Sequence, residues 1–150
     1  VAPVEEMIWS KSYVAVRHRY DGADIMHLIR AAQGKLDWAH LFSRFADHWE
    51  LLFSYVNLFR FVYPSDQNFI PSWVVEKFVS LLREDLQKPP LEQKICRGPL
   101  LDRFSYTYDI RVEGYIDPRE QLAEARGGQA AEVVLDRQIA HEETMHGWVQ

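Results

Sequence analysis

Residues 49–63 constrain the fold more than any other part of the chain, because they are apolar on nearly all sides of a helix. Large apolar side chains fill most of its positions: Leu51, Leu52, Phe53, Tyr55, Val56, Leu58, Phe59, Phe61 and Val62. A helix that is apolar all round belongs in the middle of a bundle, where neighbouring helices cover it. Pro64 ends this helix, since proline lacks the backbone donor that a helix interior needs. The short length and the polar residues Glu50, Asn57 and Arg60 do not fit a membrane span.

Amphipathic patterns of helical period precede and follow this segment. They cover residues 3–16, 21–34, 38–46 and 71–88. Asp21 and Asp37 are expected N-caps, and Asp24 completes a variant of the capping box that begins at Asp21. Gly34 is expected to end its helix. The face expected to be buried on the last helix consists of Val75, Phe78, Val79, Leu82 and Leu86. Helices joined by short connections predict a mainly α fold, a compact antiparallel helical bundle of about five helices in one domain over residues 1–150.

The segment of residues 91–130 is less regular than the rest of the chain. Apolar and polar side chains alternate in residues 104–110, which predicts a strand or an extended segment. A lone strand needs a partner. We therefore expect this segment to lie along the bundle or to pair with a sheet outside this chain. Asp117-Pro118 indicates a turn and Gly127-Gly128 a hinge, and residues 131–142 predict an amphipathic C-terminal helix.

Charge and cysteine content limit the classes of protein to which the chain can belong. The formal net charge of −5 opposes a nucleic-acid-binding surface, which needs clustered Lys and Arg. Cys96 is the only cysteine, which excludes an internal disulfide and a multi-cysteine zinc site. No apolar run approaches the roughly 20 residues of a membrane span, and no secretory signal is visible. We expect a cytoplasmic protein without a membrane partner. Because the chain begins with Val1 rather than Met, we also expect that part of the protein precedes it.

Lys11 is the most informative polar residue, because it lies within the apolar stripe of the first helix, between Ile8 and Val14. A lysine on a buried face must reach solvent, lose its proton or find an anion. Asp21 and Asp24 extend the apolar face of the next helix, so packing of the two faces would bring both carboxylates to the lysine. One interpretation is a cationic contact for a nucleotide phosphate, oriented by the carboxylates. The other is an internal ion pair combined with an ordinary N-cap.

Two runs resemble a pattern in bacterial nucleotidyltransferase-like proteins, including the toxin components of some abortive-infection systems. The runs are Pro3-Val4-Glu5-Glu6-Met7-Ile8-Trp9-Ser10-Lys11 and Arg17-His18-Arg19-Tyr20-Asp21-Gly22-Ala23-Asp24-Ile25, the latter followed by His27-Leu28. The resemblance marks Lys11, Arg17, Asp21 and Asp24 as nucleotide-binding or site-bracing residues. It implies that the chain is the helical C-terminal portion of such a protein, and that the intact protein uses a nucleoside triphosphate (NTP) and Mg²⁺. The cluster around Arg17 could touch a phosphate, although such a cluster is more often a solvated helix end.

The catalytic core of that family is not visible in this sequence. In the family, a Gly-Ser pair positions the triphosphate and an Asp-x-Asp pair holds the metal ions, and this chain contains neither pair. Two-metal chemistry needs carboxylates that hold both ions on the transferring phosphate. We therefore predict no catalytic residue and no cofactor in this chain.

Other short motifs also fail to define a catalytic or metal site. His141 and His146 are five residues apart, whereas the zinc-binding helix motif needs a spacing of four to keep both rings on one side. Glu143 and His146 have the spacing of a di-iron motif, but no second copy exists. Cys96 beside Arg97 could form a thiolate, although the sequence indicates no base for it.

The sequence thus supports two functions. In the first, the chain is the helical portion of a nucleotidyltransferase-like protein, inactive alone, and its partner is an N-terminal catalytic core outside this chain. In the second, it is a non-catalytic helical module that binds a partner protein. If a core is missing, apolar surface on the first helix and near residues 104–110 would be exposed, so we expect dimers or poor solubility.

Overall fold

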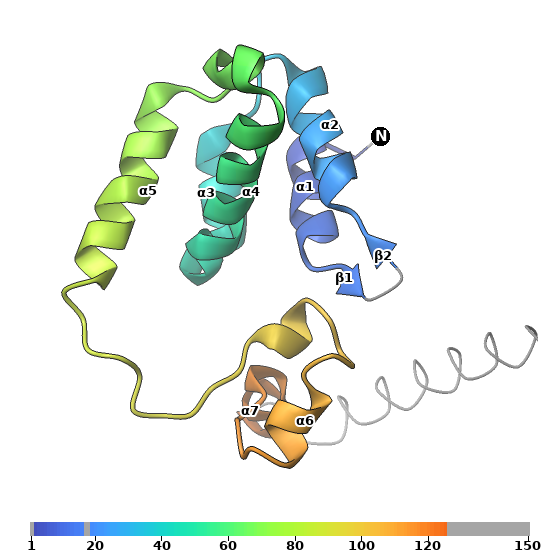
Figure 1. Ribbon diagram of the computed structural model, residues 1–150, viewed down its shortest axis with the longest axis vertical. Coiled ribbons are helices and arrows are strands. Elements are labelled where there is room, and N and C mark those ends of the chain that lie inside the picture. The colour runs from blue at the N-terminus through green and yellow to red at the C-terminus, as the bar shows by residue number, and fades with distance from the viewer. Residues whose placement is uncertain (1, 17–18, 126–150) are drawn as a thin grey trace, which may run out of the picture.

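The computed structural model describes residues 2–16 and 19–125, and their main feature is a helical bundle. Its helices are α1 (Val4–Ser12), α2 (Gly22–Ala32), α3 (Trp38–Phe45), α4 (Trp49–Val62) and α5 (Ser72–Asp85). Successive helices run in opposite directions (Figure 1). The short 3₁₀ segments η1 (Ala46–His48) and η2 (Pro64–Phe69) flank α4. The predicted antiparallel helical bundle is confirmed.

Helix α4 lies in the middle of this bundle, as its composition predicts. It contacts α2, α3 and α5, while α1 packs against α2 and α3. Leu52, Val56 and Phe59 are at most 1% exposed and form the inner face of α4. The expectation that neighbours cover α4 on every side is wrong at its end, where Phe61 is 82% exposed.

Helix α5 buries a different face from the one its sequence predicts. Val74 and Phe78 are fully buried, whereas Leu82 is 40% and Leu86 72% exposed. The Phe78 ring packs against the rings of Phe42 and Phe53, each at a centroid distance of 4.8 Å. Only the first half of α5 therefore lies against α3 and α4, and its second half extends beyond them, at the edge of the bundle (Figure 1).

The ends of the helices agree with the sequence predictions at some positions and differ from them at others. The carboxylate of Asp37 caps α3 by accepting a hydrogen bond from the His40 N–H at 2.9 Å. Helix α1 ends at Ser12 rather than near residue 16, because the chain turns there into a short antiparallel hairpin. Its strands are β1 (Ala15–Val16) and β2 (Arg19–Tyr20). Helix α2 ends at Ala32, and the left-handed turn expected of Gly34 begins one residue earlier, at Gln33.

A separate group of short elements follows α5 beyond a long connection (Figure 1). It contains η3 (Gly98–Leu100), α6 (Thr107–Arg111) and α7 (Pro118–Ala125), with one parallel bridge between Ile95 and Ile116. The predicted strand over residues 104–110 is wrong, since α6 occupies most of it. The Asp102 carboxylate accepts hydrogen bonds from the N–H groups of Phe104 and Ser105, which turns the chain into that helix.

Two further expectations concern surfaces and termini. The expectation that the first helix exposes apolar surface is wrong, because Ile8 is 1% exposed and belongs to the core. Tyr108 is 63% exposed, as expected for its segment. The amphipathic stretch of residues 131–142 and Gly127-Gly128 lie outside the described residues. Within the described part of the chain, no helix has the length and apolar character needed to cross a membrane.

Replacing Phe59 by alanine should lower the free energy of unfolding by about 3–5 kcal/mol, because it removes a buried ring and leaves a cavity. Phe61→Ala is the matched control, since this ring is on the same helix but 82% exposed. The control should change stability by less than about 0.5 kcal/mol. Urea unfolding followed by circular dichroism measures both values, and equal losses would contradict the placement of α4.

Candidate functional site

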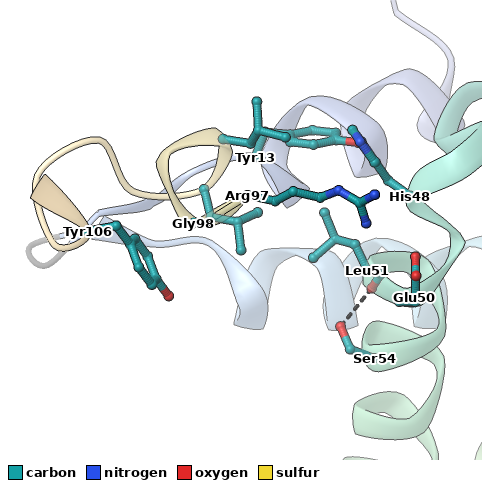
Figure 2. A pocket seen from close by; sticks show the side chains of 10 residues that line it. Tyr13, His48, Glu50, Leu51, Ser54, Arg97, Gly98 and Tyr106 are labelled. Carbon is teal, nitrogen blue, oxygen red and sulfur yellow. Dashed lines mark hydrogen bonds between the residues drawn. The ribbon is translucent and has the colours of Figure 1, made fainter. Parts of the chain in front are cut away.

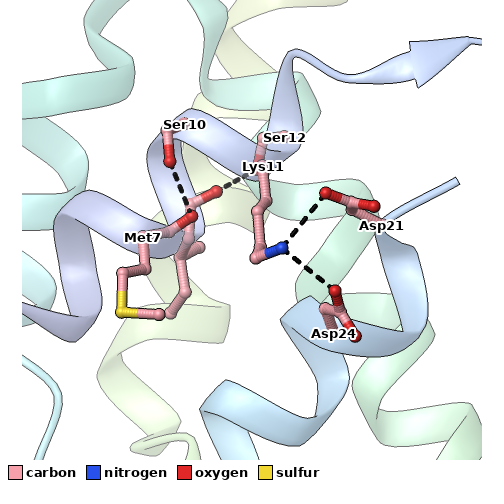
Figure 3. A network of polar contacts seen from close by, with 7 residues as sticks. Met7, Ser10, Lys11, Ser12, Asp21 and Asp24 are labelled. Carbon is pink, nitrogen blue, oxygen red and sulfur yellow. Dashed lines mark hydrogen bonds and ion pairs between the residues drawn. The ribbon is translucent and has the colours of Figure 1, made fainter. Parts of the chain in front are cut away.

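The Lys11 cluster, which consists of Lys11, Asp21 and Asp24, joins α1 to the start of α2 (Figure 3). The Lys11 ammonium lies 3.1 Å from Oδ2 of Asp21 and 3.0 Å from Oδ2 of Asp24. The side chains are 24%, 10% and 55% exposed, respectively. The convergence predicted from the sequence is therefore confirmed, and the cluster lies at the rim of the core.

Packing of the two apolar helix faces places these charged groups together. Ile8, one turn before Lys11, and Ile25, one turn after Asp21, are both buried in the core. The backbone carbonyl of Asp21 accepts the first helical hydrogen bond of α2, from the Ile25 N–H at 3.0 Å. Its carboxylate makes no capping hydrogen bond and turns to Lys11 instead. The predicted capping role of the Asp21 side chain is thus wrong, although the residue precedes the helix as expected.

The charge balance of the Lys11 cluster favours a structural role over phosphate binding. Hydrogen bonds to Asp24 and Asp21 raise the pKa of Lys11 above its ordinary value, against a smaller opposing effect of burial. Both carboxylates contact the Lys11 ammonium, so a phosphate would have to displace one of them. Arg17, the other expected phosphate contact, lies outside the described residues.

A second polar network fixes the first turn of α1 against α3. No sequence pattern predicts it. The Glu5 carboxylate accepts a hydrogen bond from the Asp37 N–H at 2.8 Å. The Glu6 carboxylate lies 2.7 Å from Nε2 of His40 and 3.0 Å from the Arg44 guanidinium. A hydrogen bond from His40 lowers the pKa of Glu6, with burial opposing it and Arg44 adding to the lowering. These acidic residues of the first turn therefore make tertiary contacts as well as complementing the helix dipole.

A pocket of about 460 Å³ lies between the bundle and the segment that contains η3 (Figure 2). Tyr13 and His48 stand on one side of it, with the phenol oxygen 2.9 Å from Nδ1 of the imidazole. Arg97 and Tyr106 come from the segment after α5. No sequence pattern indicates this pocket, because its residues come from segments far apart in the chain.

Close packing of Gly98 and Tyr106 shapes one wall of this pocket. A Cβ atom added at Gly98 would lie 2.2 Å from Cγ of the Tyr106 ring, which is far inside van der Waals contact. Glycine at this position therefore lets the ring approach the backbone. The ring in turn lines the pocket opposite the bundle.

Neither a metal site nor a comparison with known proteins indicates a function. Among residues 2–16 and 19–125, no three His, Cys, Asp or Glu side chains are grouped so that they could hold a metal ion. The motif of His141 to His146 lies outside the described residues. Comparison of the chain with protein-family models, curated proteins and solved structures finds no match. A function for this chain therefore rests on its own residues and on the resemblance of residues 3–28.

Replacing Lys11 by methionine keeps an unbranched side chain, removes the charge and should lower the melting temperature at pH 7. The nearly buried Asp21 carboxylate would then lose its contact with the Lys11 ammonium. Because folding raises the pKa of Lys11, its contribution is complete below the unfolded value of about 10.4 and is lost as pH rises through the folded value. The difference in melting temperature between wild type and variant should therefore be constant near pH 7–9 and shrink above about pH 10.4.

Thermal unfolding of both proteins across this pH range measures the difference, and ionisation of the tyrosines cancels because both proteins contain them. Lys35→Met is the control, since Lys35 is exposed and should show no such difference at any pH. A difference for Lys11 that stays constant to the highest pH would rule out the ion pair as its source.

Proposed function

We propose that this chain is the helical, non-catalytic portion of a nucleotidyltransferase-like protein. The observation that carries the proposal is the junction of Lys11 with Asp21 and Asp24, at 3.1 and 3.0 Å. These are the positions that the sequence resemblance marks, and α1 and α2 bring them together.

In this proposal the Lys11 cluster braces the site rather than binding substrate itself. The ammonium holds the start of α2 against the end of α1, at the point where the β1–β2 hairpin leaves the bundle. Fixing two helices and their connecting hairpin gives a catalytic core a rigid surface to pack against. Asp21 and Asp24 orient the lysine, and the lysine fixes both carboxylates.

The described residues do not fit a two-metal site. The Oδ2 atoms of Asp21 and Asp24 already contact the Lys11 ammonium, and a metal ion would compete with that cation for the same oxygens. Two-metal chemistry also needs further ligands that hold both ions. Mg²⁺ and the NTP would therefore be held by the core of the intact protein.

The proposal predicts where transfer activity is found. The chain alone, incubated with labelled NTPs and Mg²⁺, should yield no product, whereas the intact protein should transfer a nucleotidyl group. Its coding sequence should contain Gly-Ser and then Asp-x-Asp upstream of residue 1, within about one domain length. Lys11→Met in the intact protein should lower activity, and Lys35→Met should not. Robust transfer by the chain alone would contradict the proposal, as would an unrelated upstream domain or a stop codon there.

The second candidate is a helical module that binds a partner protein. Its support is the exposure of large apolar side chains at the end of α4 and along α5, including Phe61 at 82% and Leu86 at 72%. Exposed apolar side chains mark an interaction site where they gather into one patch. An unrelated domain upstream, combined with inactive intact protein, would favour this second function over the first.

A further inference from the structure

We propose that the pocket between Tyr13, His48 and Arg97 binds a small aromatic carboxylate, with the apolar body inside and the carboxylate on Arg97. This inference goes beyond the proposed function, because it concerns a ligand of the helical portion itself. It does not involve the Lys11 cluster, and none of the three cluster residues lines the pocket.

The walls of the pocket suit an apolar ligand of modest size. Its volume of about 460 Å³ falls within the range of small-molecule sites. Leu51 of α4 and Leu100 and Leu101 of the η3 region line it with apolar side chains. The rings of Tyr13 and Tyr106 also line it, and aromatic side chains pack favourably against a flat ring. This lining favours a flat apolar body over a sugar or a polar chain.

Arg97 is suited to hold a carboxylate at this pocket. Its side chain is exposed, and no ion pair joins it to another residue of the described ranges. Figure 2 shows the guanidinium reaching across the pocket towards the side where His48 and Leu51 lie. A guanidinium binds a carboxylate through two parallel N–H donors, a geometry that a lysine cannot offer.

The Tyr13–His48 pair adds polar groups to the pocket wall. Burial raises the pKa of Tyr13 and so keeps the phenol protonated. The phenol oxygen lies 2.9 Å from Nδ1 of His48, so this contact fixes the position of the imidazole ring. Tyr13 and His48 both line the pocket, so polar ring atoms stand beside its apolar wall.

Glu50 limits the charge of the ligand. It is exposed and lines the same pocket as Arg97, so the two formal charges cancel. Glu50 repels a carboxylate with one negative charge less than a phosphate monoester, which carries nearly two charges at neutral pH. The ligand class is therefore an aromatic monoanion rather than a nucleotide.

Titration of the ¹⁵N-labelled chain with 2-naphthoate, 2-naphthamide and adenosine monophosphate tests the proposal. We expect 2-naphthoate to bind with a Kd below about 1 mM and to shift the amide signals of Leu51, Gly98 and Leu101. The neutral amide has the same shape without the charge, and it should bind about tenfold more weakly. Adenosine monophosphate should also bind more weakly than 2-naphthoate.

Two arginine variants locate the anion contact. Arg97→Gln should weaken 2-naphthoate binding about tenfold, while Arg83→Gln on the exposed part of α5 should leave it unchanged. Tyr13→Phe should weaken binding by a smaller factor, since it removes the hydroxyl that fixes the position of the His48 ring. Circular dichroism confirms that each variant is folded.

Four results would overturn the inference. They are absence of 2-naphthoate binding at millimolar concentration, equal binding by the neutral amide, equal binding by Arg97→Gln, and tighter binding of adenosine monophosphate. Amide shifts confined to the exposed face of α5 would equally exclude the pocket as the site. Because none of these measurements involves nucleotidyl transfer, their failure leaves the proposed function untouched.

Discussion

Burial of the inner face of α4 is the constraint on which the rest of this structure depends. Leu52, Val56 and Phe59 face α2 and α3, and the shared core fixes where those helices lie. Helix α1 then closes the group by packing against both α2 and α3 through Ile8. Apolar burial on this scale supplies the main driving force for folding. The charged clusters at the rim of the core favour the one arrangement of the helices in which their charged groups are paired.

The end of helix α1 contributes one residue to each candidate site. Its last turn directs Lys11 towards α2, where two carboxylates hold it. Two residues later, after the helix has ended, Tyr13 points the other way and meets His48 next to α4. At the opposite end, Glu5 and Glu6 bind the start of α3. Polar contacts at both ends therefore fix α1 in rotation as well as in position.

Several features of the fold could be predicted because they depend on neighbours in the sequence. The N-cap at Asp37 and the stop at Pro64 involve groups within one helical turn, and the structure has both where expected. The errors occur where longer-range packing decides. Residues 104–110 alternate like a strand, but no partner strand is present within the described residues, and the turn at Asp102 favours a helix. The exposed end of α5 follows from the absence of a further helix there among those residues, which no periodicity can reveal.

The candidate sites divide in the same way. The sequence by itself determined the Lys11 cluster, because helical spacing places Lys11, Asp21 and Asp24 on two apolar faces that must meet to leave water. Only the tertiary structure decided that Asp21 binds the lysine instead of capping α2, since the two uses of one carboxylate compete and packing sets the distance. The pocket of Tyr13, His48 and Arg97 also belongs to the tertiary structure alone. Tyr13 and His48 are 35 residues apart, and no local pattern links them to each other or to Arg97, because their proximity arises only when the bundle and the η3 segment pack together.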